Sequence, residues 1–260
     1  MSQKIAHTYK RLVYAFYCSE DDNNDYIKQL HYRILERYIN IFDEVIFCII
    51  INDVNDIETI KNVEKRILSM CHNDISFKIY ENTNYRETHI FYEEIFLRMK
   101  DLYGSTFFAH SKGGGVMNSR EEIIAFILGA YFFSLEKNEN VPNYPFYGSF
   151  KMVNNGPISS MGIKYDWFYV GTFFWGNYEQ VYNEKKMVFP IFSTRWFDEM
   201  FPGELYEEWK CGTLNNCCFR VEDRKPVDAF DLIETTYGKE PIFGEYLKLY
   251  NELVDEFAER

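Results

Sequence analysis

The sequence lacks the features that would place it in several common functional classes. It has no excess of positive charge, because 28 lysines and arginines stand against 40 aspartates and glutamates, for a formal net charge of −12. Binding through a phosphate backbone needs a basic face, so this balance argues against a nucleic-acid partner. No apolar run approaches the roughly 18 residues that a transmembrane helix requires. We also expect no signal peptide, because no apolar segment with a small-residue cleavage site lies near the N-terminus.

The cysteines indicate neither a disulfide framework nor a zinc site. Cys18 and Cys48 lie inside apolar runs typical of strands, which favours reduced and buried thiols. Cys211, Cys217 and Cys218 lack C-x-x-C spacing, and no histidine is near them in the sequence. The sequence therefore predicts a protein of a reducing compartment, and we expect it in the cytoplasm.

Several catalytic motifs are also missing. No glycine-rich dinucleotide fingerprint follows the first apolar run, and there is no Gly-x-Ser-x-Gly or His-Glu-x-x-His. The glycines Gly113 to Gly115 follow Lys112 instead of preceding it, which is not the order of a P-loop.

What the sequence does contain is a repeated alternation of strand and helix. Three apolar runs predict strands, and each is followed by apolar residues at helical spacing. The predicted strands are Leu12–Cys18, Val45–Ile51 and Ile75–Tyr80, and the predicted helices are Tyr26–Phe42, Ile57–Met70 and His89–Lys100. This alternation indicates an α/β protein with a mostly parallel sheet flanked by helices.

The character of the chain changes at Asn140, where glycine, proline and aromatic residues become frequent and clean helical periodicity is lost. Phe146–Val153 and Trp167–Phe174 are each predicted to be a strand, as an antiparallel extension of the sheet. Later helices are predicted at Trp196–Lys210, broken by Pro202–Gly203, and at Tyr246–Ala258. We expect a single domain of residues 1–260 with two functional halves, 1–139 and 140–260.

The most informative stretch is Ser105–Arg120, STFFAHSKGGGVMNSR. Its apolar run predicts a short buried strand that ends in the polar tip His110–Ser111–Lys112. A helix follows the glycines, because Ser119 and Glu122 fit a Ser-x-x-Glu capping box directly before an apolar run. A polar tip at the carboxyl end of a strand, followed by glycines and a helix start, is typical of an anion-binding site.

Two other polar tips follow predicted strands, at Ser19–Asp22 and Asn52–Asp53. Because parallel strands end at the same edge of a sheet, we expect all three tips to converge there.

The tip and three further blocks resemble a poorly characterised group of glycosyltransferases with a GT-A-like nucleotide-sugar fold. The hallmark of the group is a strand that ends in His-Thr-Lys-Gly or His-Ser-Lys-Gly, matched here by His110–Gly113. Glu87–Leu97 resembles a helical block, Gly171–Trp175 a glycine with an aromatic pair, and Glu207–Trp209 a Glu-x-Trp motif. The resemblance implies a GT-A-like (Rossmann-like) fold with a nucleotide-sugar half, 1–139, and an aromatic-rich C-terminal acceptor half, 140–260. It also implies that a sugar is transferred from a nucleotide diphosphate sugar to a glycan or protein acceptor.

Transfer of this kind requires the charge on the leaving diphosphate to be neutralised. Lys112 would supply a point charge and His110 a hydrogen-bond donor, with Ser111 and Gly113 completing the clamp. The sequence departs from metal-dependent GT-A enzymes because it has no Asp-x-Asp. A need for Mn²⁺ or Mg²⁺ therefore stays open.

The other donor-site candidates are Ser19, Glu20, Asp53 and Arg86. The resemblance implies a nucleoside site after the first strand, and Arg86 could reach a phosphate. Each candidate has a structural alternative, because polar residues at such positions also cap helices.

On the acceptor side, Thr172 and Trp175 follow a predicted strand, and a tryptophan face suits stacking on a sugar, with core packing as the alternative. A carboxylate is needed as general base if the reaction inverts, and Glu208 is the first choice. Asp166, Glu204 and Glu207 are rivals that the sequence does not rank. Three other interpretations remain: a catalytically silent nucleotide- or sugar-binding module, a nucleotidyl or phosphoryl transferase, and an aromatic-rich interaction protein.

Overall fold

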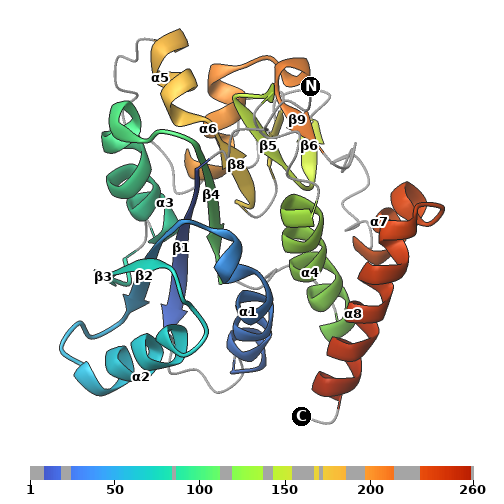
Figure 1. The fold of residues 1–260 in the computed structure, drawn as a ribbon, viewed down its shortest axis with the longest axis horizontal. Coiled ribbons are helices and arrows are strands. Elements are labelled where there is room, and N and C mark those ends of the chain that lie inside the picture. The colour runs from blue at the N-terminus through green and yellow to red at the C-terminus, as the bar shows by residue number, and fades with distance from the viewer. Residues whose placement is uncertain are drawn as a thin grey trace, which may run out of the picture.

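The computed structural model is an α/β protein built on a mixed, mostly parallel sheet flanked by helices (Figure 1). It describes residues 9–18, 25–83, 86–111, 119–136, 143–153, 167–169, 172–185, 197–213 and 229–258. In these ranges the main sheet has seven strands in the order β3-β2-β1-β4-β8-β5-β9. The predicted α/β class is therefore confirmed.

The strands are β1 (Lys10–Cys18), β2 (Glu44–Ile51), β3 (Asp74–Glu81), β4 (Ser105–His110), β5 (Phe146–Gly148), β6 (Lys151–Val153), β7 (Trp167–Tyr169), β8 (Phe174–Gly176) and β9 (Gly212–Thr213). The helices are α1 (Asp25–Tyr38), α2 (Ile57–Leu68), α3 (Arg86–Ile90), α4 (Arg120–Glu136), α5 (Tyr178–Lys185), α6 (Phe197–Leu205), α7 (Ala229–Tyr237) and α8 (Pro241–Ala258). A π-helical turn, Phe91–Ile95, and a 3-10 segment, Phe96–Asp101, extend α3, while shorter 3-10 turns lie at Ile39–Ile41 and Glu208–Lys210.

The first half of the chain forms the parallel part of the sheet, as predicted. β1 pairs in parallel with both β2 and β4, and β2 pairs in parallel with β3. β2 is buried from Val45 to Ile51, which explains why its sequence is continuously apolar. β3 is the edge strand and is exposed at alternate positions along most of its length.

The second half extends the sheet in the antiparallel sense, which confirms that prediction. β8 is antiparallel to both β4 and β5. The predicted strand boundaries were wrong, because β5 and β6 are separate strands and β6 pairs with β7 in a second, two-stranded sheet. Phe150, between β5 and β6, has a φ of 55°, and Thr172, before β8, has a φ of 60°. Left-handed backbone interrupts a strand, and the apolar pattern alone does not reveal it.

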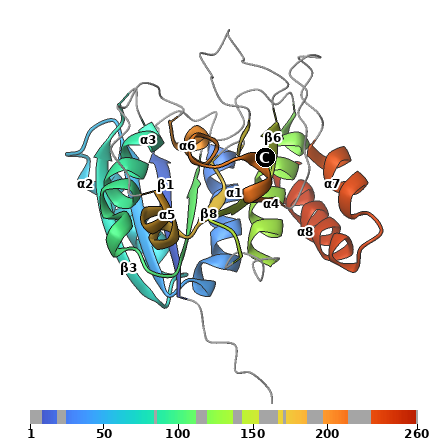
Figure 2. The ribbon, with the colours of Figure 1, turned by 90° about the horizontal axis from the view of Figure 1, so that it is seen from above.

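Helices cover both faces of the sheet. One apolar cluster joins one face to α1, α2, α4, α7 and α8, and a second joins the other face to the α3 segment, α5 and α6. Figures 1 and 2 show α7 and α8 beside α4, at the far end of the molecule from α2. Because α4 lies between the sheet and these two helices, it is buried continuously from Ile124 to Leu135, which accounts for its apolar sequence.

The predicted helices differ from the structure in three ways. Two helices, α5 and α7, were not predicted, and α8 begins at Pro241, before the predicted start at Tyr246. The expected break at Pro202–Gly203 is wrong, because α6 continues through Pro202 to Leu205. Phe201, fully buried in α6, packs edge-on against Phe91 at 5.2 Å between ring centroids, and this packing offsets the local cost of proline.

The capping box at the start of α4 is confirmed in part, because the backbone N–H of Glu122 donates to the hydroxyl oxygen of Ser119 over 3.2 Å. Within the described ranges, no helix combines the length and the apolar character that a membrane span needs. The division of residues 1–260 into a nucleotide-sugar half and an acceptor half stays a prediction.

Candidate functional site

The candidate site lies at the carboxyl ends of β1 and β4. These strands are parallel neighbours, but β1 leads to β2 on one side and β4 leads to β5 on the other. Such a reversal of direction opens a crevice in which α/β proteins commonly bind ligands. His110 ends β4 at this edge of the sheet and Ser111 follows it, while Asn52 and Asp53 follow β2 along the same edge. Convergence is thus confirmed for these residues, while Ser19–Asp22, Lys112 and Gly113 lie outside the described residues.

Ser111 ties the ends of the two central strands together. Its hydroxyl oxygen accepts a hydrogen bond from the backbone N–H of Tyr17 over 2.7 Å. Its own backbone N–H donates to the carbonyl oxygen of Ala15 over 2.9 Å. A serine hydroxyl both accepts and donates, so Ser111 also carries a proton that it can donate.

Glu87, near the start of α3, meets the same edge. The side chain of Glu87 is 4% exposed, and its carboxylate accepts a hydrogen bond from the Tyr17 hydroxyl. Tyr17 therefore joins α3 to the tip of β4, through its side chain on one side and its backbone on the other. Arg86 begins α3 beside Glu87, and its side chain lies outside the described part of the structure.

His110 lies beneath the tip, with only 4% of its surface exposed. Its imidazole stacks on Phe173, with 5.3 Å between ring centroids and 15° between the planes. Phe173 packs in turn against Tyr131 of α4 at 5.1 Å. Thr172, which precedes Phe173, is fully buried in the left-handed backbone region, where a β-branched residue is strained. Strain of this kind is typical of functional sites, which keeps Thr172 a candidate.

A second histidine, His31 of α1, lies close to this region. Its Nδ1 makes a hydrogen bond of 2.8 Å with the Tyr14 hydroxyl, and its Nε2 has no partner among the described residues. Burial, together with the smaller effect of the charge of His110, lowers the pKa of His31 to about 3. His31 is therefore neutral at pH 7, and the sequence did not single it out.

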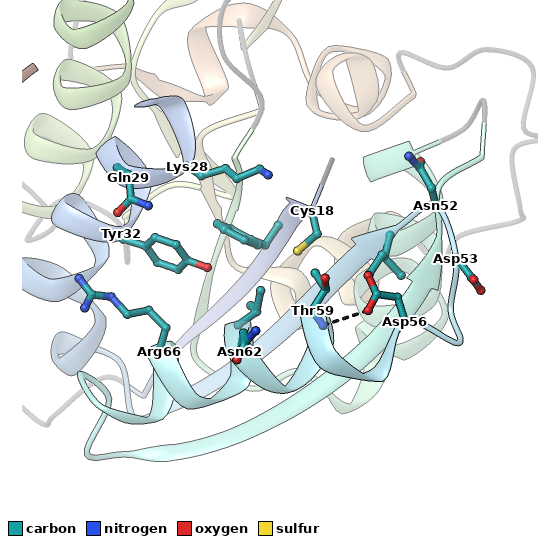
Figure 3. A pocket seen from close by; sticks show the side chains of 13 residues that line it. Cys18, Lys28, Gln29, Tyr32, Asn52, Asp53, Asp56, Thr59, Asn62 and Arg66 are labelled. Atoms are coloured by element: carbon teal, nitrogen blue, oxygen red, sulfur yellow. Dashed lines mark hydrogen bonds between the residues drawn. The ribbon is translucent and has the colours of Figure 1, made fainter. Parts of the chain in front are cut away.

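A cavity of about 500 Å³ lies between α1 and α2, at the carboxyl ends of β1 and β2 (Figure 3). Its lining comprises Phe16, Cys18, Lys28, Gln29, Tyr32, Ile51, Asn52, Asp53, Asp56, Thr59, Asn62, Val63 and Arg66. The pKa of the Cys18 thiol is raised to about 12, because desolvation by burial outweighs the opposing effect of the charge of Lys28. The cavity was not predicted, although Lys28 and Tyr32, like Asn62 and Arg66, are four residues apart and share a helix face.

Asp53, one of the predicted donor-site residues, lies at the rim of this cavity. Its carboxylate accepts hydrogen bonds from the backbone N–H of Asn55 at 2.9 Å and from the side-chain amide of Asn55 at 3.1 Å. Figure 3 shows the Asp53 side chain directed away from the cavity. These contacts give Asp53 the role of a turn residue, the structural alternative for this position.

Trp175 is placed in the core, with an exposed fraction of 0%. Its indole N–H donates to the carbonyl oxygen of Ser134 over 2.8 Å, and its ring packs against Phe107 at 5.2 Å. Because ring and N–H both have core partners, the structure gives Trp175 the packing role that was the alternative to sugar stacking.

The backbone of Glu208, the first choice as base, does not lie at the same edge of the sheet as His110. The strands β4 and β9 run in the same direction. The pairing of residues through β8 and β5 places Gly212 of β9 at the same height in the sheet as Phe107 of β4. The backbone of Glu208 precedes Gly212, so it enters the sheet from the amino edge, whereas His110 lies beyond Phe107 at the carboxyl edge. Glu204 and Glu207 belong to the same segment as Glu208, and Asp166 lies outside the described residues.

Among the described residues, no three His, Cys, Asp or Glu side chains are grouped closely enough to hold a metal ion. The sequence matches no protein-family model and no curated protein.

Proposed function

We propose that the protein is a glycosyltransferase with a GT-A-like fold, which transfers a sugar from a nucleotide diphosphate sugar to a glycan or protein acceptor. The observation that supports this most is the position of His110 and Ser111. His110 ends β4 and Ser111 follows it, at the point between β1 and β4 where the direction of the chain reverses and an α/β sheet commonly binds a phosphorylated ligand.

The leaving diphosphate needs donors that are already in place when its charge develops. Ser111 is suited to this role because its oxygen is held by the Tyr17 N–H and its own proton can reach a phosphate oxygen. His110 is held by its stack on Phe173. Lys112, the next residue in the sequence, supplies the positive charge in this proposal.

The general base is a separate question in this proposal. Glu208 and Asp166 stay predictions, and a base on the Glu208 segment would have to act across the height of the sheet. The proposed function therefore rests on the residues of the donor side of the site. Metal dependence is also left to experiment, because Asp-x-Asp is missing.

The test is thermal unfolding with a panel of nucleoside diphosphates and their sugars, with and without Mn²⁺. A ligand at 100 times its dissociation constant adds about 2.7 kcal/mol of stability. We expect one nucleoside diphosphate and its sugar to raise the melting temperature of the wild type, and Lys112→Ala to abolish the rise. Lys248→Ala, at an exposed lysine of α8, is the matched control and should leave the rise unchanged.

The reaction products then distinguish the glycosyltransferase from the alternative functions. Release of nucleoside diphosphate from a bound sugar donor supports the glycosyltransferase. Release of pyrophosphate points to a nucleotidyl transferase, and binding without turnover points to a silent module. If no nucleotide shifts the wild-type melting curve, the proposal is overturned.

A further inference from the structure

One edge of the main sheet, along β3, is open among the residues that the structure describes. β3 pairs with β2 over its whole length, from Asp74 to Glu81, and no described strand pairs with its other side. Natural proteins usually protect such an edge with a proline, a β-bulge or a very short strand. β3 has eight residues, contains no proline and pairs with β2 without a bulge. This edge is therefore able to accept another strand.

The hydrogen bonds at the end of β3 show which of its backbone groups face outward. The N–H of Asn82 donates to the carbonyl oxygen of Ile51 over 2.9 Å, so the backbone of Asn82 is directed toward β2. This direction alternates along a strand of unbroken register, so the even-numbered residues of β3 bond to β2. The N–H and C=O groups of the odd-numbered residues Ile75, Phe77 and Ile79 therefore point to the open side.

The helix beside this edge has an exposed apolar flank. α2 connects β2 to β3 and lies at this end of the molecule (Figures 1 and 2). Asn62 and Arg66 line the cavity on the side of α2 that faces α1. At about 3.6 residues per turn, Ile57 and Leu68 project from the opposite side of the helix, toward the β3 edge. Each is 52% exposed, and Ile79, on the same face of the sheet, is 46% exposed.

Two charged residues complete this flank of α2. Lys61 and Glu64 lie between Ile57 and Leu68 at helical spacing, so the four residues form one stripe. The spacing along the stripe is symmetric, and its order is apolar, basic, acidic, apolar. When the stripe is reversed, an apolar residue meets an apolar residue and a lysine meets a glutamate. The α2 flank is therefore complementary to a second copy of itself.

We propose that β3 and α2 form the interface of a symmetric dimer, in which β3 pairs antiparallel with β3 of a second copy of the chain. A two-fold axis brings the same patch of both copies together, and this symmetry requires the self-complementarity that α2 shows. The two main sheets become one continuous sheet through β3. This inference does not depend on the proposed function.

The charges of β3 select the register of this pairing. Outward-facing residues must lie opposite each other, and two registers then keep nearly the whole strand paired, one centred on Phe77 and one on Lys78. The register centred on Lys78 would place two lysines directly opposite each other, which is destabilising. The register centred on Phe77 pairs two aromatic rings and sets Ile75 opposite the partner's Ile79, so we assign this register.

The same axis brings the two copies of α2 together. Neighbouring strands are about 4.8 Å apart, so two helices that each lie above β2 and β3 are about 10 Å apart across the axis. This distance is close to the usual spacing of packed helices. Ile57 then lies opposite the partner's Leu68, and Lys61 lies opposite the partner's Glu64. The dimer therefore covers the exposed apolar residues of the β3 edge and pairs the charges between them.

The experiment is analytical ultracentrifugation of the full chain over a range of concentrations. We expect the wild type to reach twice the mass of one chain, which is 31.2 kDa. Lys61→Glu sets two carboxylates against each other on both sides of the axis and should weaken the dimer about tenfold. Lys61→Glu combined with Glu64→Lys restores opposite charges and should recover the dimer. Lys248→Glu, on α8 at the far end of the molecule, is the matched control and should leave the dimer unchanged.

Two further measurements test the strand pairing. Ile79→Lys places a charge between the two copies of β3 and should also weaken the dimer about tenfold, while thermal unfolding checks that the variant is folded. In residue-resolved hydrogen exchange, the amides of Ile75 and Phe77 should be protected in the dimer and exchange faster when dilution dissociates it. The amides of Lys78 and Tyr80 bond to β2, so their protection should not depend on concentration.

Each contrary result overturns the proposal. If the wild type keeps the mass of one chain at every concentration, the dimer does not form. If a dimer forms but Lys61→Glu and Ile79→Lys leave its affinity unchanged, or if the Ile75 and Phe77 amides exchange equally fast in dimer and monomer, the dimer uses another surface. If the double variant does not recover the dimer that Lys61→Glu weakens, the pairing of α2 with its copy is wrong.

Discussion

The backbone N–H of Tyr17 donates to the hydroxyl oxygen of Ser111 over 2.7 Å, across the boundary between β1 and β4. The two strands end here, and their chains leave toward opposite sides of the sheet. The backbone pairing of β1 and β4 ends at Ala15 and His110, and beyond it the hydrogen bond to the Ser111 side chain takes the place of a backbone–backbone hydrogen bond. This arrangement keeps the ends of the two strands together at the point where their chains diverge.

Replacing Ser111 should test the structural value of this bond. In Ser111→Ala the Tyr17 N–H loses its acceptor in a partly buried position, which costs roughly 1–3 kcal/mol. The free energy of unfolding, measured with urea, should fall by that amount. Ser76→Ala, at an exposed serine of β3, is the control and should change stability by less than about 0.5 kcal/mol. Equal losses of stability in Ser111→Ala and Ser76→Ala would show that the hydrogen bond from Tyr17 to Ser111 does not stabilise the fold.

The hydrogen bond between Tyr17 and Glu87 should appear as an energetic coupling. The Tyr17 hydroxyl donates to a carboxylate that is almost completely buried. Tyr17→Phe, Glu87→Gln and the double variant form a double-mutant cycle, and we expect a coupling energy of roughly 0.5–3 kcal/mol in stability. If the losses of stability in the two single variants simply add, the two side chains are not coupled, and their hydrogen bond does not stabilise the contact between α3 and β1.

Stability should depend on pH through His31. The pKa of His31 is lowered to about 3 in the folded protein, so between this value and the ordinary value of about 6.5 the unfolded chain binds more protons. The stabilising contribution is present in full above pH 6.5 and is lost as the pH falls toward 3. The slope approaches about 1.4 kcal/mol per pH unit within this window.

The measurement is urea unfolding of the wild type and of His31→Gln between pH 5 and pH 8. Carboxylates titrate in both proteins, so the difference between the two curves isolates His31. The groups around His31 are Tyr14 of β1, Tyr131 of α4 and His110 of β4. Parallel curves over this range would show that His31 takes up its proton without a cost to folding.

The start of α4 should depend on Ser119. Its hydroxyl accepts the Glu122 N–H over 3.2 Å, so Ser119→Ala should cost about 0.5–2 kcal/mol in the free energy of unfolding. Ser119→Asp keeps an acceptor at the same place and should retain most of the stability. If both substitutions cost the same, the hydroxyl does not act as a cap.

Much of the structure of residues 1–139 could be predicted because its signals are local. The run Val45–Ile51 indicates a strand buried on both faces, and the spacing of Ile60, Val63 and Ile67 indicates a helix that packs on it. Residues 140–260 were harder to predict, because left-handed residues that are not glycine, such as Phe150 after β5 and Thr172 before β8, interrupt an apolar pattern that reads as continuous. Tertiary packing also carries α6 through Pro202 against local propensity.

By itself, the sequence determined that polar tips follow the parallel strands and that a capped helix starts at Ser119, because capping and hydrophobic periodicity act over a few residues. Only the tertiary structure decided that Trp175 packs in the core, that Glu208 precedes a strand at the opposite edge, and that Lys28 and Arg66 face one cavity. Spacing along a helix shows which residues share a face. What lies opposite that face depends on contacts between segments far apart in the chain, and these are set by the packing of the whole fold.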